Sequence, residues 1–267
     1  ADLDFSEETG PGGKLSTESD YCPGQYFGWK AIVGFNGSLD GQGHSIKGLY
    51  QDNRTVYCTG ATHFMNNNGI FYSFEKDVTI KNLVLEDNFV GCTRGKSREC
   101  SLLGSFYETR YNSDYPDKNY NAVFENIVAR NNTIVGDGSS RGLFGEFSSN
   151  FGDITFKNIY IYDDVSISND GAEKASSLIS VANAKTLEIS NVRIDGMHVG
   201  RIEGGRDDAV LAYNVGASDM LKIGNILSTM SATNIEGNLF NSASYSSGIS
   251  LNGINMLRIG DNQNNLV

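Results

Sequence analysis

The chain has 267 residues, of which 39% are hydrophobic, and it carries a formal net charge of −11 with an isoelectric point near 4.7. This length and hydrophobic content suffice for a sizeable core in one elongated domain. The acidic balance argues against a nucleic-acid partner, because phosphates require a basic face. It is compatible with a secreted protein or with Ca²⁺ binding, although no cofactor is assigned. Without a run of about 18 apolar residues, no membrane span is expected.

Residues 1–34 form an N-terminal excursion, rich in Gly and Ser, that leads into the first strands. The chain opens at Ala1 without a charged and then apolar leader, so we expect any signal peptide to have been removed. Residues 35–50 follow and read FNGSLDGQGHSIKGLY. His44 takes an inward position in this stretch, and we expect it to cap the core with a hydrogen bond rather than to act as a base.

One six-residue pattern recurs down the chain: an apolar residue, any residue, Asn, an aliphatic residue, any residue, and a small or aliphatic residue. Residues alternate as in a strand before each Asn, and the alternation resumes one residue out of step after it. Asn tolerates positive φ better than other residues with side chains, so we predict a bend at each Asn and a ladder of stacked Asn amides. The Asn residues lie about 32 to 44 positions apart, a period typical of solenoids. They are Asn82, Asn126, Asn158, Asn191 and Asn225.

Two further copies extend this pattern toward the chain ends. The copy from His44 to Leu49 has Gly48 in place of Asn, and Gly adopts positive φ at least as readily, so we predict the same bend there. The copy that begins at Leu257 places Asp261 at the bend and Asn262 where an aliphatic residue belongs. We therefore expect the core to decay near the C-terminus and to leave strand edges that invite pairing with another molecule.

A second repeated element predicts another strand in each repeat. Together the two elements give roughly three short strands per repeat, and parallel strands wound this way form a right-handed β-helix. We predict an all-β right-handed parallel β-helix of about six to seven turns with an internal Asn ladder. One domain spans residues 1–267, with repeating turns over 35–267. Copies of the second element are Gly69-Ile70-Phe71, Leu102-Leu103-Gly104, Gly142-Leu143-Phe144-Gly145, Ser177-Leu178-Ile179-Ser180 and Gly248-Ile249-Ser250.

The stretch over 35–50, preceded by Trp29-Lys-Ala-Ile32, resembles the first turns of bacterial extracellular proteins that carry the GLUG motif. The motif's own Gly-Leu-x-Gly stands here as Gly142-Leu-Phe-Gly145, with weaker copies at Leu103-Gly104 and Gly69-Ile70. The resemblance implies a right-handed β-helix from a protein that is secreted or held at the bacterial cell surface. It implies no activity, because the family includes surface proteases and adhesin-like proteins alike.

Four cysteines lie in polar, loop-like stretches that lack the spacing of zinc ligands. Cys92 and Cys100 bracket a short loop that a disulfide would pin, and Cys22 would then pair with Cys58. Two disulfides would indicate an oxidising compartment. Four free thiols are the alternative.

The register of the Asn repeat assigns the outward side chains. Before the bend, Lys81, Glu125 and Lys157 fall in one column, which predicts a ladder of ion pairs. After it, exposed aromatic groups beside arginines favour a binding face for a partner or a sugar. Insertions at 107–121 and 137–141 would alternatively cover this face. The two columns after the bend are Val84, Val128, Tyr160, Arg193, Leu227 and Glu86, Arg130, Tyr162, Asp195, Thr229, and the candidate binding residues are Arg130, Tyr160, Tyr162 and Arg193.

The loop over 195–208 is the best candidate for catalysis, because it combines a titratable His with several acids and two arginines between two predicted strands. β-Helix hydrolases and lyases need clustered aspartates, or Ca²⁺-binding acids beside a basic residue, and the sequence completes neither set. A solvated, salt-bridged loop is the alternative, so we assign no catalytic residue and no metal ligand. The polar residues of this loop include His198, Arg201, Glu203, Arg206, Asp207 and Asp208.

The sequence favours a non-enzymatic extracellular β-solenoid module for cell-surface structure, adhesion or filament assembly. Its partners would be proteins or further copies of the chain. One alternative is a carbohydrate-active enzyme, either a polysaccharide lyase or a glycoside hydrolase, with a groove along one sheet. Another is a carbohydrate-binding module whose partner is a polysaccharide.

Overall fold

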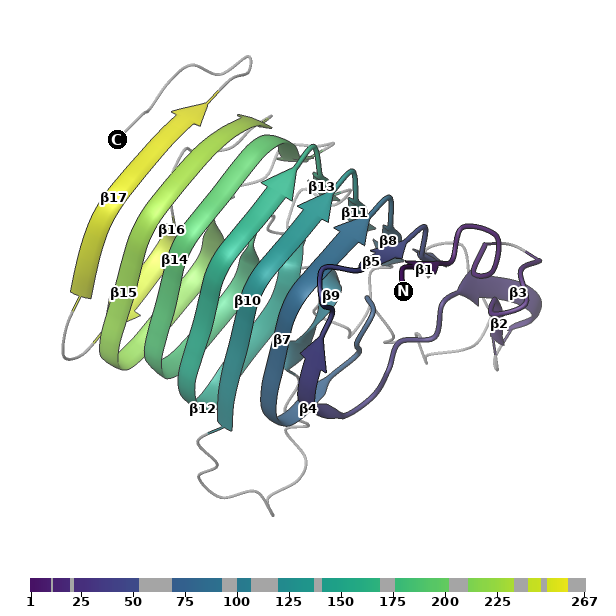
Figure 1. Cartoon of the computed structure of the whole chain (residues 1–267), viewed down its shortest axis with the longest axis horizontal. Helices are drawn as coiled ribbons and strands as arrows, with labels where there is room; N and C mark the ends of the chain where they lie inside the picture. The colour runs from purple at the N-terminus through teal and green to yellow at the C-terminus, as the bar shows by residue number, and fades with distance from the viewer. Residues whose placement is uncertain are drawn as a thin grey trace.

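The computed structural model describes residues 1–10, 12–19, 22–52, 69–92, 100–106, 120–136, 141–168, 176–201, 211–232, 240–245 and 249–258. Within these residues the chain is all-β and contains no helix. Its strands form one curled sheet, in which the pairings of β3 with β2 and β6 are antiparallel and the other pairings are parallel (Figure 1). The predicted all-β class and the parallel pairing are confirmed.

The strands fall into an N-terminal group of short segments and a following group dominated by long, curved strands (Figure 1). Strands β1 and β17 lie toward opposite ends of the sheet. The first group is β1 (Leu3–Asp4), β2 (Thr17–Ser19), β3 (Cys22–Gly28), β4 (Phe35–Asp40), β5 (Ser45–Lys47) and β6 (Tyr50–Asp52). The second group is β7 (Phe74–Glu86), β8 (Phe89–Cys92), β9 (Cys100–Phe106), β10 (Tyr120–Arg130), β11 (Thr133–Gly136), β12 (Arg141–Tyr162), β13 (Val165–Ser168), β14 (Ile179–Arg201), β15 (Ala212–Ala232), β16 (Phe240–Tyr245) and β17 (Ile249–Arg258).

The Asn bends and the Asn ladder are confirmed. All five Asn residues of the repeat have φ between 53° and 55°. Each side-chain Nδ2 donates to Oδ1 of the preceding Asn at 2.8 or 2.9 Å, from Asn225 back to Asn82. At the N-terminal end Asn82 donates to Asp40 Oδ1 at 2.9 Å. The ladder therefore ties five neighbouring repeats together and ends on a carboxylate.

Gly48 lies in a different bend from the one predicted. Strand β5 pairs Lys47 with Glu86, so Gly48 stands level with Asp87 and not with Asn82. It belongs to a second column of positive φ that continues through Asp87, Asn131, Asp163 and Gly196. The corner opposite Asn82 is instead Gly41 to His44, which is two residues longer than the Asn82-Leu83 corner of the next repeat. The sequence period predicted the wrong bend for Gly48, because the two extra residues of this corner shift Gly48 along the repeat.

The C-terminal copies of both repeated elements were also predicted in the wrong place. Strand β17 pairs Asn252 with Gly224 and Ile254 with Ile226, which places Gly253 opposite Asn225. Ile249 pairs with Leu221 and so belongs to the strand before the Asn bend, not to the second element. The last repeat is shorter than the average period, and the bend falls before Asp261, which lies outside the described residues.

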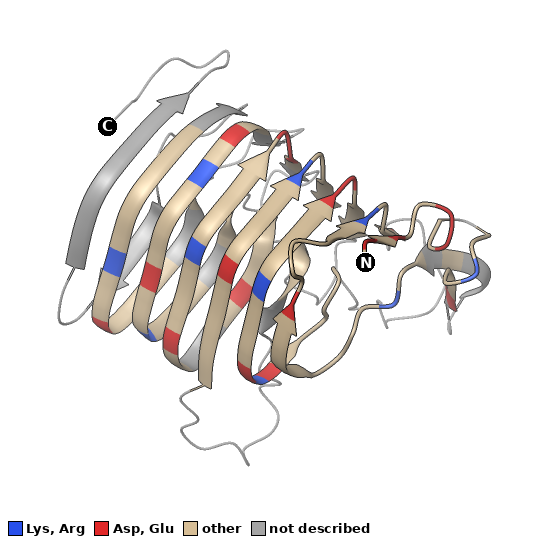
Figure 2. Cartoon of the chain, viewed as in Figure 1, with Lys and Arg blue, Asp and Glu red and all other residues tan. Residues whose placement is uncertain are grey.

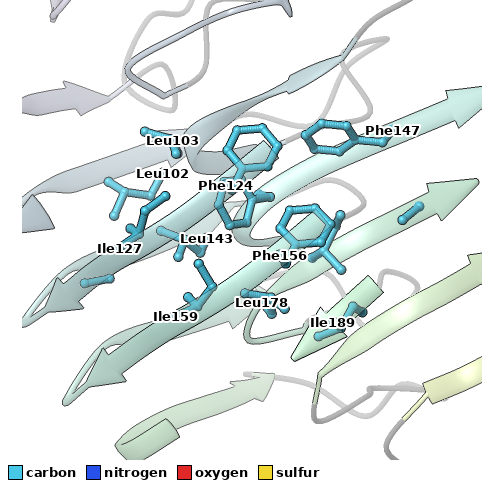
Figure 3. Packing of buried hydrophobic residues seen from close by; sticks show 14 of the residues in the cluster. Leu102, Leu103, Phe124, Ile127, Leu143, Phe147, Phe156, Ile159, Leu178 and Ile189 are labelled. Atoms are coloured by element: carbon cyan, nitrogen blue, oxygen red, sulfur yellow. The ribbon is translucent and has the colours of Figure 1, made fainter. Parts of the chain in front are cut away.

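Aromatic side chains fill the centre of the core (Figure 3). Phe124 and Phe156 come from neighbouring repeats and stack with ring centroids 5.3 Å apart and an interplanar angle of 10°. Phe144 and Phe147, from the second repeated element and the residues after it, lie 4.5 and 5.5 Å from the Phe124 ring. The two repeated elements thus face each other across one core, and their apolar residues are almost wholly buried.

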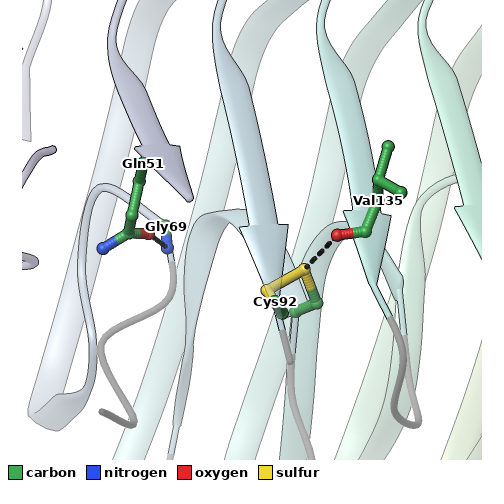
Figure 4. The surroundings of a disulfide bond; sticks show 5 residues. Gln51, Gly69, Cys92 and Val135 are labelled. Carbon is green, nitrogen blue, oxygen red and sulfur yellow. Dashed lines mark hydrogen bonds between the residues drawn. A yellow bond between two sulfur atoms is a disulfide. The ribbon is translucent and has the colours of Figure 1, made fainter. Parts of the chain in front are cut away.

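One predicted disulfide is present in the described residues. Cys92 and Cys100 are bonded, with their Cα atoms 5.9 Å apart, and they join the end of β8 to the start of β9 (Figure 4). Cys58 lies outside the described residues, so the predicted pairing with Cys22 stays a prediction.

The prediction for His44 was wrong. Its side chain is 46% exposed, and Nδ1 lies 3.3 Å from Asp2 Oδ1 instead of capping the core. The extra residues of its corner turn it outward. In the described part of the chain, no helix is long and apolar enough to cross a membrane.

Candidate binding face

The two outward columns after the Asn bend exist as predicted. Strand pairing places Val84, Val128, Tyr160, Arg193 and Leu227 side by side, and does the same for Glu86, Arg130, Tyr162, Asp195 and Thr229. We call the surface formed by these ten residues the Tyr–Arg face. The four candidate binding residues come from three adjacent strands, β10, β12 and β14, so the structure brings them together.

Two ion pairs neutralise the arginines of this face. Arg130 Nη2 lies 2.9 Å from Glu86 Oε2 across neighbouring strands. Arg193 contacts Asp195 within β14, with Nη2 and Nε each 2.6 Å from Oδ2. The hydrogen bond and charge of Asp195, with smaller contributions from Tyr162 and Tyr160, raise the pKa of Arg193 above its ordinary value. Both arginines are exposed, yet the face is close to electrically neutral.

Tyr160 and Tyr162 lie between these two ion pairs. Tyr160 pairs with Val128 on one side and Arg193 on the other, and Tyr162 pairs with Arg130 and Asp195. Both tyrosines are half-buried, so part of each side chain is accessible to solvent. The alternative prediction was that the insertions at 107–121 and 137–141 cover this face. Except for their last residues, which belong to β10 and β12, these insertions lie outside the described residues.

An open hollow of about 480 Å³ lies at the N-terminal end of the face, and its lining residue Val128 pairs with Tyr160 of the next strand. The hollow is lined by Gln42, Gly43, Asn82, Leu83, Val84, Asn126 and Val128. Gln42 belongs to the corner that is two residues longer than the next one, so this corner forms one wall of the hollow. Along the first column, the two valines of the hollow are therefore followed by Tyr160.

The ion-pair column before the bend is also confirmed. Lys81, Glu125 and Lys157 pair in register, and Asp40 extends the column by one strand. Lys81 lies 3.4 Å from Asp40, and Lys157 lies 3.5 Å from Glu125. Figure 2 shows charges of both signs alternating from strand to strand across the sheet. These pairs are exposed and add little to stability.

The loop over 195–208 is described only in part. His198 and Arg201 lie in the last residues of β14, where their backbones pair with Val165 and Ser168 of β13. Glu203, Arg206, Asp207 and Asp208 lie outside the described residues, so the candidate catalytic cluster stays a prediction. No group of three or more His, Cys, Asp or Glu side chains that could hold a metal occurs among the residues that the structure describes.

The sequence reasoning missed a second set of stacked polar residues, which lies inside the core. Asn88, Asn132 and Asp164 are each at most 2% exposed and are linked by hydrogen bonds. They follow Asn82, Asn126 and Asn158 at one constant spacing, and this regularity would have revealed them. We call these three residues the buried ladder.

Comparison with known proteins finds no matching family model, no significantly similar curated protein and no significantly similar solved structure.

Proposed function

We propose that this chain is a non-enzymatic extracellular adhesion module that binds a neutral polysaccharide through the Tyr–Arg face. The curled sheet would be a right-handed parallel β-helix of about six to seven turns, as in the bacterial surface proteins that the sequence resembles. The observation that carries the proposal is the placement of Tyr160 and Tyr162 on one outward face of the sheet, one strand away from an open hollow lined in part by Val128.

The chemistry of the face supports a sugar ligand. A pyranose ring has an apolar face of C–H groups and a rim of hydroxyls, so it is complementary to half-buried tyrosines flanked by charged groups. The pairing of Arg130 with Glu86 and of Arg193 with Asp195 leaves little excess positive charge, which favours a neutral glycan over an anionic one.

The same ion pairs argue against catalysis on this face. The carboxylates of Glu86 and Asp195 each accept a hydrogen bond from a guanidinium of the face, so neither is left free to act on a substrate. Self-association, the other partnership expected from the sequence, stays a prediction.

Binding to immobilised neutral and anionic glycans, followed by calorimetry on the best ligand, tests the proposal. We expect Tyr160→Ala and Tyr162→Ala each to weaken binding by about 10-fold to 100-fold, because buried aromatic contacts dominate such interfaces. Tyr26→Ala is the matched control, because Tyr26 is a 45% exposed tyrosine in β3, outside the face. It should bind like the wild type.

Three outcomes would refute the proposal. Absence of glycan binding, or binding that neither tyrosine substitution weakens, would refute the role of the face. Preference for anionic glycans would contradict the charge argument. Release of new reducing or unsaturated ends from a polysaccharide would show an enzyme instead, and this assay should be run with and without Ca²⁺.

A further inference from the structure

The buried ladder is a chain of side chains that each accept a hydrogen bond from the preceding repeat. Leu49 N–H donates to Asn88 Oδ1 at 2.9 Å, and Asn88 N–H donates to Asn132 Oδ1 at 3.0 Å. Asn132 N–H donates to Asp164 Oδ1 at 2.7 Å. Asp164 therefore occupies, in its repeat, the place that an Asn holds in the two repeats before it.

Each Asn of the buried ladder also donates a hydrogen bond to a backbone carbonyl. Asn88 Nδ2 donates to Ile46 O at 3.1 Å, and Asn132 Nδ2 donates to Leu85 O at 3.0 Å. Strand pairing aligns Ile46 with Leu85 and Leu85 with Ala129. The equivalent acceptor for Asp164 is thus the carbonyl of Ala129. An ionised carboxylate has no proton to donate there, whereas a carboxylic acid has one.

No described cation faces Asp164. Its hydrogen-bond partner Asn132, which precedes β11, is uncharged, and so is Ser166 of β13. In the next repeat the position of Asp164 is taken by Met197 of β14, which is also uncharged. Asp163, its neighbour in the chain, adds a negative charge. The titratable residues of β14 that flank Met197 are Asp195, at the register position of Tyr162, and His198, at the register position of Val165.

We propose that Asp164 is protonated in the folded protein up to neutral pH and donates to Ala129 O, so that its ionisation loosens the contact between neighbouring repeats. Burial is the main cause that raises the pKa of Asp164 to about 7. The hydrogen bonds from Asn132 oppose this shift, and the charge of Asp163 adds to it. Asp164 thus acts as a pH-sensitive substitute for Asn inside the core.

The sign of the effect follows from proton binding. The folded state holds the Asp164 proton at pH values where the unfolded chain, with a pKa near 3.8, has released it. The contribution of Asp164 to the free energy of unfolding is therefore fully present below about pH 4, and it is lost as the pH rises through about 7. Between pH 5 and 8.5, this group alone should raise the unfolding equilibrium constant on the order of a hundredfold.

Urea unfolding of the wild type and Asp164→Asn at pH 5, 7 and 8.5 tests this proposal. The amide always carries its donor, so the variant should lack the hundredfold change and be the more stable protein at pH 8.5. His198→Gln is the matched control and should keep the wild-type dependence, since it leaves the Asp164 proton in place. Asp163→Asn should reduce the dependence only in part, because it removes the charge that adds to the Asp164 shift. Parallel pH profiles for the wild type and Asp164→Asn would overturn the proposal.

A second measurement needs no substitution. The ¹³Cγ chemical shift of Asp164 in the wild-type protein should titrate with a midpoint near 7. A midpoint near 4 would show that Asp164 is ionised in the folded protein at neutral pH and would overturn the proposal even if Asp164→Asn failed to fold.

Discussion

At the scale of single residues, the core tolerates a few buried polar groups that the hydrogen-bond network does not use. The hydroxyl of Ser166 is wholly buried in β13 and finds no partner among the described residues. A buried hydroxyl without a partner costs about 1–3 kcal/mol. Asn132 lies in the same core but differs from Ser166, because it takes part in at least four hydrogen bonds, with Asn88, Asp164 and the Leu85 carbonyl.

We expect Ser166→Ala to raise the free energy of unfolding by about 1 kcal/mol, because it removes the unpaired hydroxyl and leaves only a small cavity. Urea unfolding at one pH measures this change. Ser38→Ala, at an exposed position of β4, should change stability by less than about 0.5 kcal/mol. Destabilisation by Ser166→Ala would mean that the hydroxyl has a partner, such as a buried water.

At the scale of the repeated element, the Asn bend combines two functions in one residue. Asn158 holds φ at 53°, donates to Asn126 and accepts from Asn191. A residue without a polar side chain loses both hydrogen bonds, and a residue with a Cβ also incurs strain at positive φ. Gly loses the hydrogen bonds alone, so comparing two substitutions separates the two effects.

We therefore expect Asn158→Ala to lower the free energy of unfolding by about 2–3 kcal/mol and Asn158→Gly by about 1 kcal/mol. Asn183→Ala, at an exposed position in β14, is the control and should be nearly neutral. Equal losses for the Ala and Gly variants would show that the bend stores no strain and that the ladder accounts for the whole effect.

The sequence was sufficient to predict the Asn bends, their ladder and the outward columns, because a regular alternation fixes which side chains share a face. It was insufficient for Gly48 and Gly253, because a corner can gain residues and a repeat can shorten without changing the alternation on either side. Burial depends on what packs from elsewhere in the chain, so nothing in the adjacent acids Asp163 and Asp164 indicates that Asp164 is only 2% exposed.

At the scale of the whole molecule, stability is spread unevenly along the sheet. The large buried phenylalanines gather in β7, β10 and β12, where the Phe124 ring contacts Phe74, Phe144, Phe147 and Phe156. Molecules built from stacked repeats are stabilised mainly by contacts between neighbours, so damage to one repeat spreads only a short distance. The aromatic cluster should be the most protected part of the fold.

We expect Phe124→Ala to lower the free energy of unfolding by about 3–5 kcal/mol, because it leaves a large cavity among the surrounding rings. Hydrogen exchange followed by mass spectrometry should show faster exchange in β7, β10 and β12 and little change in β17. Val123→Ala, an outward position of β10, is the matched control. A uniform loss of protection from β4 to β17 would contradict this local response and show one cooperative unit.

The Asn ladder also has an electrical direction. All five amides donate toward the N-terminal end, so their dipoles add along the axis of the sheet, as peptide dipoles do along a helix. The carboxylate of Asp40 sits at the positive end of this line, and the hydrogen bond from Asn82 is the main cause that lowers its pKa. The described residues, which include no helix, thus contain a counterpart of the helix macrodipole, and an acidic residue occupies the end where an anion is most stable.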